Sequence, residues 1–272
     1  MINASKGLQA GIAAIVLGTA THLNAPGSVA FPSSPAAILL QRVLPAILIT
    51  FIFALLAYRI HAVTLGGAVA GSVVSVIIFT FTGPRGFAAL AIVFLLTAAA
   101  TRVGYARKQK LRTAERHRGR RAAQVLANVG VAAAFSVGAA LVRHGYWLVV
   151  PMVAALCEAA ADTVSSECGQ AWSDRVYLIT NFERVSVGTD GGISVPGTVA
   201  GICAAAVVAG LCYNMQLMPR HWAYIAGAAG MLGGFVDSLL GAWFERRRWL
   251  TNNLVNLLST LAAAILSMLF LL

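Results

Sequence analysis

Residues 146–169 read Y-W-L-V-V-P-M-V-A-A-L-C-E-A-A-A-D-T-V-S-S-E-C-G, an apolar run that ends among carboxylates. Glu158 and Asp162 are four residues apart, so on a helix they share one face. An Asp at the centre of a membrane-spanning helix costs about 2.5–3.5 kcal/mol on insertion scales, and acids in such segments usually serve a function. Six of the nine acidic residues of the chain lie between Glu158 and Asp190. We therefore expect this stretch to hold a ligand.

The rest of the chain is strongly apolar, with 59% hydrophobic residues and a mean hydropathy of +0.80. Apolar runs recur at about the 20 residues that a helix needs to cross a bilayer. They are too long for barrel strands, so the sequence predicts an all-α, polytopic transmembrane helix bundle. About nine segments are expected: 7–24, 36–57, 63–80, 84–101, 122–142, 146–161, 195–213, 222–242 and 251–272. The first of them is interpreted as a spanning helix; Lys6 and the small residues near Ala25 also allow a signal peptide.

The net charge of +11 is concentrated in one hydrophilic segment. Its nine basic residues are opposed only by Glu115; they are Arg102, Arg107, Lys108, Lys110, Arg112, Arg116, Arg118, Arg120 and Arg121. The positive-inside rule places this segment in the cytoplasm, and threading the chain from it predicts a cytoplasmic N-terminus. The expected organisation is N-terminal transmembrane helices in 1–104, a basic cytoplasmic loop in 105–121, and a transmembrane core in 122–272 that carries the polar site.

The basic loop has two further interpretations: it could bind anionic lipid headgroups, or it could concentrate an anionic substrate. Nucleic-acid binding is not expected, because the loop lacks interleaved aromatic residues and a reader motif. The four cysteines contain no C-x-x-C pair and no histidine at zinc spacing, so they are interpreted as packing residues.

Three carboxylates are the candidate catalytic and metal-binding residues: Asp162, Glu167 and Asp237. Asp237 lies in G-G-F-V-D-S-L-L-G-A (233–242), whose glycines permit close helix contact. Hard oxygen ligands favour Mg²⁺, which binds through one or two carboxylates together with substrate phosphates. The sequence therefore predicts a magnesium site at the cytoplasmic ends of these helices.

Amide side chains and a glycine-rich run are the candidate phosphate-binding groups. Asn128, Asn252 and Asn256 are expected near the same membrane surface as the carboxylates. The run G-T-D-G-G-I-S-V-P-G-T (188–198) contributes the remaining candidates: Gly188, Thr189, Asp190, Gly191, Gly192 and Ser194. Backbone N–H groups in such turns can converge on an anion, although the run lacks the G-K-[ST] ending of a Walker A motif.

Five blocks of sequence resemble one widespread integral-membrane family. They are R-R-A-A-Q-V-L-A-N (120–128), A-D-T-V-S-S-E-C-G (161–169), G-T-D-G-G-I-S-V-P-G-T-V-A-G (188–201), F-V-D-S-L-L-G-A (235–242) and N-N-L-V-N (252–256). The family includes the plant phytyl-phosphate kinase of the vitamin E pathway. Family members more often carry Asn at the position of Asp190, and that departure leaves the donor and the substrate open.

The resemblance implies a membrane kinase that transfers a phosphoryl group from CTP or ATP to an isoprenoid monophosphate and forms the diphosphate. Its partners would be the lipid-phosphate substrate and the bilayer, and its active face would be cytoplasmic. The alternative is a transporter or flippase for a phosphorylated lipid or small anion. A transporter should show inverted repeats and broken helices at the midplane, whereas the acids here fall near one membrane surface.

Overall fold

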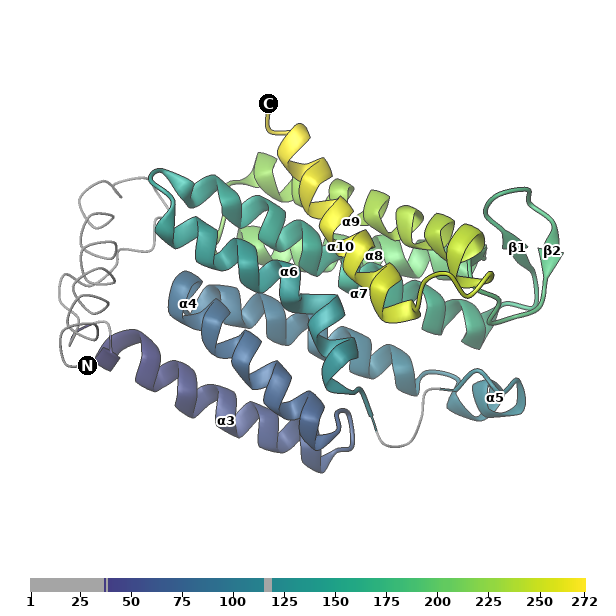
Figure 1. The fold of residues 1–272 in the computed structure, drawn as a ribbon, viewed down its shortest axis with the longest axis horizontal. Coiled ribbons are helices and arrows are strands. Elements are labelled where there is room, and N and C mark those ends of the chain that lie inside the picture. The colour runs from purple at the N-terminus through teal and green to yellow at the C-terminus, as the bar shows by residue number, and fades with distance from the viewer. Residues whose placement is uncertain (1–36, 38, 115–118) are drawn as a thin grey trace.

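Helix α7 (Val149–Trp172) runs through the centre of the computed structural model, which describes residues 37, 39–114 and 119–272 (Figure 1). Together with the 3₁₀ turn η2 (Gly145–Leu148) it forms a candidate span that is 89% buried, whereas the other candidate spans are 17–39% buried. Among the described residues, seven helices are long and apolar enough to cross a membrane. The prediction of an all-α transmembrane bundle is confirmed, and its first segment, 7–24, lies outside the described residues.

The helices that surround α7 are α4 (Leu65–Arg102), α6 (Ala122–Leu141), α8 (Val195–Asn214), α9 (Arg220–Leu240) and α10 (Asn252–Leu269). Helix α3 (Leu44–Arg59) packs on α4 at the edge of the bundle. Three short elements complete the helical part: the π-helical turns η1 (Leu39–Val43) and η3 (Gly241–Glu245), and the helix α5 (Tyr105–Lys110).

Helix α4 (Leu65–Arg102) is a hairpin of two helical arms. Gly83 has φ 72° and ψ −168°, a conformation that is essentially open only to glycine, and Pro84 follows it. The far ends of the arms meet at Arg120, which receives the N–H of Thr64 on its carbonyl oxygen and donates to the Thr97 hydroxyl. Both arms leave the bend in roughly the same direction (Figure 1). The predicted segments 63–80 and 84–101 therefore correspond to these two arms.

Helix α7 continues well beyond residue 161, where the apolar segment was predicted to end. Its polar last turns remain helical because neighbouring helices bury them and small residues let those helices approach. A Cβ atom added at Gly197 of α8 would lie 2.6 Å from the Ser165 carbonyl oxygen, and one at Gly233 of α9 would lie 2.8 Å from Glu158 Cγ. Hydropathy ended the segment too early because these polar side chains face protein rather than lipid.

The segment between α7 and α8 contains a small antiparallel sheet with strand order β2-β1-β3. Strand β1 (Val176–Leu178) pairs with β2 (Arg184–Val185) through Val176↔Val185, and with β3 (Gly192–Ile193) through Tyr177↔Ile193. The glycine-rich run begins in the turn that connects β2 to β3. The pairing of these two strands with β1 therefore fixes both ends of that turn. The sequence predicts only a loop in this segment and gives no sign of these short strands.

Most basic residues lie at the end of the bundle that carries the sheet, where α4 and α7 end and α6, α8 and α10 begin. They include Arg59, Arg102, Arg107, Lys108, Arg120, Arg175, Arg184, Arg246, Arg247 and Arg248. The opposite end carries Arg42, Arg85, Arg143 and Arg220. The prediction that the sheet end faces the cytoplasm rests on this asymmetry.

Candidate functional site

A cavity of about 360 Å³ opens at the sheet end of the bundle. Helices α7 and α9, the turn before β3 and the start of α10 contribute to its wall. All twelve residues that the sequence analysis singled out line it: Asn128, Asp162, Glu167, Gly188, Thr189, Asp190, Gly191, Gly192, Ser194, Asp237, Asn252 and Asn256. Asn128 and Asn256, which are 128 positions apart in the chain, thus line the same cavity.

Asp162 of α7 and Asp237 of α9 are close enough for their carboxyl groups to share a hydrogen bond. Ser259 supports Asp237, with its hydroxyl oxygen 3.1 Å from Oδ2. Glu158 lies one turn before Asp162, is 1% exposed, and has one carboxyl oxygen without a hydrogen-bond partner among the described residues. Carboxylates this close repel each other unless a proton or a cation lies between them.

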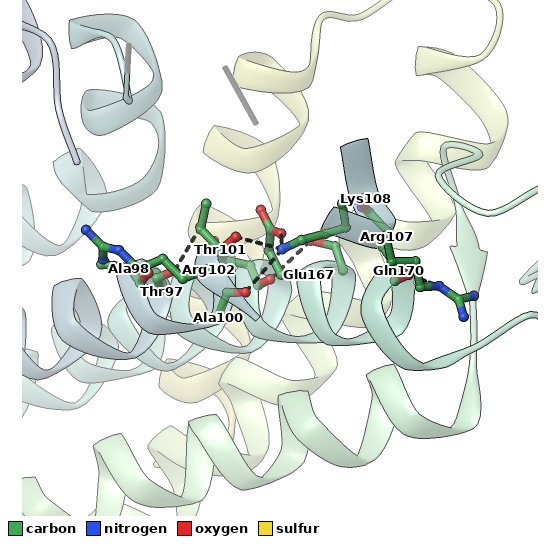
Figure 2. Close-up of polar contacts among 11 residues, drawn as sticks. Thr97, Ala98, Ala100, Thr101, Arg102, Arg107, Lys108, Glu167 and Gln170 are labelled. Atoms are coloured by element: carbon green, nitrogen blue, oxygen red, sulfur yellow. Dashed lines mark hydrogen bonds and ion pairs between the residues drawn. The ribbon is translucent and has the colours of Figure 1, made fainter. Parts of the chain in front are cut away.

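Glu167 is placed differently from the other two predicted metal ligands. Its carboxylate pairs with the fully buried ammonium group of Lys108, which also donates to the carbonyl oxygens of Ala100 and Thr101 at the end of α4 (Figure 2). Glu167 still lines the cavity, but a metal would have to compete with Lys108 for it. The ion pair joins α5, α4 and α7.

The carboxylates fit a Mg²⁺ ion whose remaining ligands come from water and substrate phosphates rather than from further protein side chains. The described residues contain no group of three or more His, Cys, Asp or Glu side chains arranged to hold a metal. Asp162 and Asp237 supply two carboxylates at one point, and Mg²⁺ commonly binds one or two carboxylates, several waters and substrate phosphates.

Two of the predicted amides are bonded to each other across the bundle. The Asn256 side chain donates to Asn128 Oδ1 at 2.6 Å, and both residues are buried. The Asn256 Oδ1 atom has no partner among the described residues. Asn252 is exposed one turn earlier and hydrogen-bonds to Glu245. The cavity wall therefore holds a fixed amide pair, and a third amide lies nearer the opening.

The glycine-rich turn is shaped by two residues with positive φ, Gly188 at 86° and Gly191 at 74°. A Cβ atom at Gly191 would lie 2.5 Å from Ala242 of η3, so the turn packs tightly on that element. The hydroxyls of this run bond locally: Thr189 donates to the Ser186 carbonyl at 2.7 Å, and Ser194 caps α8 by accepting the Gly197 N–H at 3.3 Å. Backbone N–H groups are therefore the better candidates for anion contacts.

Asp190 lies at the rim of the cavity, beside the charged side chains of Glu245, the last residue of η3, and Arg246, the residue that follows it. Partial burial raises the pKa of Asp190, and the nearby Arg246 opposes this shift. Glu245 also approaches Asp190, which adds negative charge at the rim. An anionic ligand would meet less repulsion here when Arg246 or a cation balances these carboxylates.

Sequence analysis did not single out Arg120 and Glu245 as site residues, although both line the cavity. Arg120 interacts electrostatically with Asp162, and its backbone is fixed by the Thr64 and Ala62 bonds. In the sequence, Arg120 belongs to the basic residues that predict the membrane orientation. Its position just before Gln124 and Asn128 was the one sign that it could also belong to the polar site. Glu245 precedes three arginines, and only the π-helical turn η3 directs it toward the cavity.

Comparison with known proteins places the chain in a family. The family model described as "Integral membrane protein DUF92" matches residues 48–264. An uncharacterised membrane protein of Methanocaldococcus jannaschii is 32% identical over 232 residues, which cover 85% of this chain and 94% of that protein. An uncharacterised membrane protein of Synechocystis is 30% identical over 199 residues, covering 71% and 76% of the two chains.

A plant relative, the chloroplastic protein VTE6 of Arabidopsis thaliana, is 29% identical over 203 residues, which cover 69% of this chain and 59% of that protein. No solved structure matches the chain. The region matched by the family model spans every helix that lines the polar cavity, from α6 to the part of α10 that carries Asn252 and Asn256. The chain belongs to the DUF92 family of integral membrane proteins.

Proposed function

We propose that this protein is a membrane kinase that transfers a phosphoryl group from CTP or ATP to an isoprenoid monophosphate and forms the diphosphate. The observation that carries the proposal is the single cavity in which carboxylates, buried amides, Arg120 and the glycine-rich turn meet at one end of a lipid-embedded bundle. The resemblance to the family of phytyl-phosphate kinase and the similarity to VTE6 support the same substrate class.

Phosphoryl transfer requires positioning and charge neutralisation more than covalent chemistry by the protein. An oxygen of the acceptor phosphate forms a bond to the γ-phosphorus of the donor, while the bond from that phosphorus to the β–γ bridging oxygen breaks. The nucleoside diphosphate leaves with the electron pair. The acceptor phosphate is already ionised, so the reaction needs no strong general base.

The residues around the cavity divide this task. The turn of Gly188, Asp190 and Gly191 binds the donor phosphates, and Gly192, Thr189 and Ser194 hold that turn in place. Asn128 and Asn256 orient the acceptor phosphate beside Arg120, and Asn252 lies at the opening. Asp162 and Asp237 would hold Mg²⁺, with Glu167 as a further candidate beside Lys108. Magnesium, when bound, would neutralise negative charge on the transferred group.

The direct test uses the full chain purified into lipid nanodiscs, with Mg²⁺, radiolabelled CTP or ATP, and a series of prenyl monophosphates. We expect a labelled prenyl diphosphate. Asp162→Asn and Asp237→Asn should each lower turnover by a factor of about 10² or more, the scale on which loss of one transition-state electrostatic contact is felt.

Asp174→Asn is the matched control, because Asp174 is an exposed carboxylate paired with Arg107 outside the cavity. Its turnover should equal that of the unmodified protein. If the folded protein yields no diphosphate from any acceptor and donor, the kinase proposal is wrong. If product forms and both cavity variants match the control, the metal assignment is wrong and the kinase stands.

The second candidate, a transporter or flippase for a phosphorylated lipid or small anion, is favoured by Glu158. This carboxyl is buried among helices with an unpartnered oxygen, as expected of a proton- or ion-coupling group. Against it, α6, α7, α8 and α10 each run as a single helix through their spans. Uptake or leaflet exchange of a labelled lipid phosphate in proteoliposomes, without formation of diphosphate, would favour this candidate.

A further inference from the structure

A second, smaller cavity of about 90 Å³ lies within the membrane-spanning part of the bundle. Helix α3, both arms of α4, α6 and α7 enclose it. Phe53, Leu90, Val93 and Phe94 form apolar walls, and Phe53 contacts Phe94 edge to face at 5.0 Å between ring centroids. The first arm of α4 contributes small residues such as Gly71, which leave the space open. None of the roles assigned above uses this cavity.

The two cavities adjoin at Arg120 and Asn128, which line both. The guanidinium group of Arg120 is held by a 2.9 Å bond to the Thr97 hydroxyl, and its backbone N–H donates to Ala62 at 3.1 Å. Asn128 is held by Asn256 at 2.6 Å. A fixed cation and a fixed amide therefore stand where the polar space meets the apolar one.

This juxtaposition suits a ligand with a phosphate at one end and a hydrocarbon chain at the other. A phosphate beside Arg120 and Asn128 would direct its ester substituent into the second cavity, whose largely apolar lining suits a hydrocarbon chain better than a nucleoside. Resting on the proposed function, we propose that the cavity enclosed by α3, α4, α6 and α7 holds the phosphate-proximal part of the hydrocarbon chain of a lipid monophosphate. The donor nucleotide then enters from the sheet end.

The position of α3 provides the route for the remainder of the chain. A cavity of this volume encloses only the first part of a long lipid, so the rest must reach the bilayer. Helix α3 is the least buried candidate span, at 17%, and packs mainly on α4. Its residues Phe51, Ile52 and Leu55 are exposed to the lipid side. The chain would therefore leave the protein beside α3.

The first test is photolabelling, which does not depend on catalysis. The full chain in nanodiscs is irradiated with a 20-carbon prenyl monophosphate that carries a diazirine near its phosphate end, and labelled peptides are mapped. We expect label in α3 and the two arms of α4. Label confined to the outer faces of α8 and α9 would overturn the proposal.

Gly71→Leu fills the cavity from its wall, because a Cβ there would still lie 3.9 Å from the nearest atom, Val125 Cγ1. We expect it to reduce labelling and to raise the KM for the 20-carbon acceptor by on the order of tenfold, the scale of a misfit in a hydrophobic pocket. The KM for a five-carbon prenyl monophosphate should change much less. Gly210→Leu is the matched control, since Gly210 has open space around it on α8 and lines neither cavity.

Equal labelling and equal KM values in the Gly71 and Gly210 variants would contradict the proposal. If Gly71→Leu does not fold, Ala54→Leu on the opposite wall replaces it, and the map of the unmodified protein is decisive by itself. Labelling of α3 and α4 without any diphosphate product would remove the kinase and leave the chain-binding site. Diphosphate formation with the label elsewhere would support the kinase and rule out the proposed chain-binding site.

Discussion

Lys108 is a fully buried cation whose three contacts all come from other elements (Figure 2). A buried ion pair contributes little net stability relative to apolar packing, but loss of one partner leaves an uncompensated charge. Lys108 therefore adds little net stability, but the buried carboxylate of Glu167 needs it as a counter-charge. The role of Glu167 can be decided at this pair.

We expect Lys108→Met to destabilise the protein by about 3–5 kcal/mol, because it leaves the Glu167 carboxylate without its cation in a largely buried place. Lys108→Met combined with Glu167→Gln should recover most of that loss. Unfolding in detergent, followed by heat or denaturant, measures both. If Lys108→Met alone is as stable as the unmodified protein, the ion pair does not contribute to stability as expected.

The double variant also tests the metal prediction for Glu167. If Glu167 serves only the ion pair, the double variant should retain kinase turnover under the conditions of the direct test. If Glu167 holds Mg²⁺, turnover should be lost although stability is restored. Asp162→Asn provides the reference for loss of a carboxylate at the metal position.

At the scale of elements, the hairpin in α4 depends on one residue. Gly83 adopts φ 72° and ψ −168°, and this bend brings both Thr64 and Thr97 within hydrogen-bond distance of Arg120. The same arms form two walls of the apolar cavity. We therefore expect a change at Gly83 to alter the junction between the two cavities.

We expect Gly83→Ala to destabilise the protein by about 1–3 kcal/mol, the cost of holding a side chain in a region open mainly to glycine. Gly130→Ala is the control, because Gly130 lies within α6 with no atom near its missing Cβ, and alanine favours a helix. Thermal unfolding should show the first variant below the unmodified protein and the second at or above it. Equal midpoints for both would mean that the bend is not strained for alanine.

At the scale of the whole molecule, every helix end that contributes to the polar cavity lies at the end that carries most of the positive charge. Under the positive-inside rule we expect this end to face the cytoplasm. An active face on that side would give the enzyme access to nucleotide donors, while its apolar substrate remains in the bilayer. The orientation is thus tied to the proposed reaction.

Two single-cysteine variants in a cysteine-free background test the orientation. Glu183→Cys lies beside the sheet, and Asn214→Cys lies at the opposite end of α8; both positions are exposed. A membrane-impermeant maleimide should label residue 214 in right-side-out vesicles and residue 183 only in inverted vesicles. The reverse pattern would place the polar cavity on the outer surface.

The sequence by itself determined the class of the fold, and it predicted which residues share one cavity. Hydropathy runs near 20 residues long predict helices because lipid leaves backbone groups no other partners. The predicted site residues are carboxylates, amides and a glycine-rich run in or beside those segments. All twelve line one cavity, and their roles there stay a prediction. Both conclusions follow from local chemistry and require no knowledge of packing.

Only the tertiary structure decided how those residues are used. It extended α7 to Trp172, paired Glu167 with Lys108, joined Asn128 to Asn256, and brought Arg120 to the boundary of two cavities. Each of these results depends on contacts between segments that are distant in the chain, or on burial by neighbouring helices. Local sequence shows that a polar group in a membrane segment needs a partner, but only the packing of the helices determines which partner it meets.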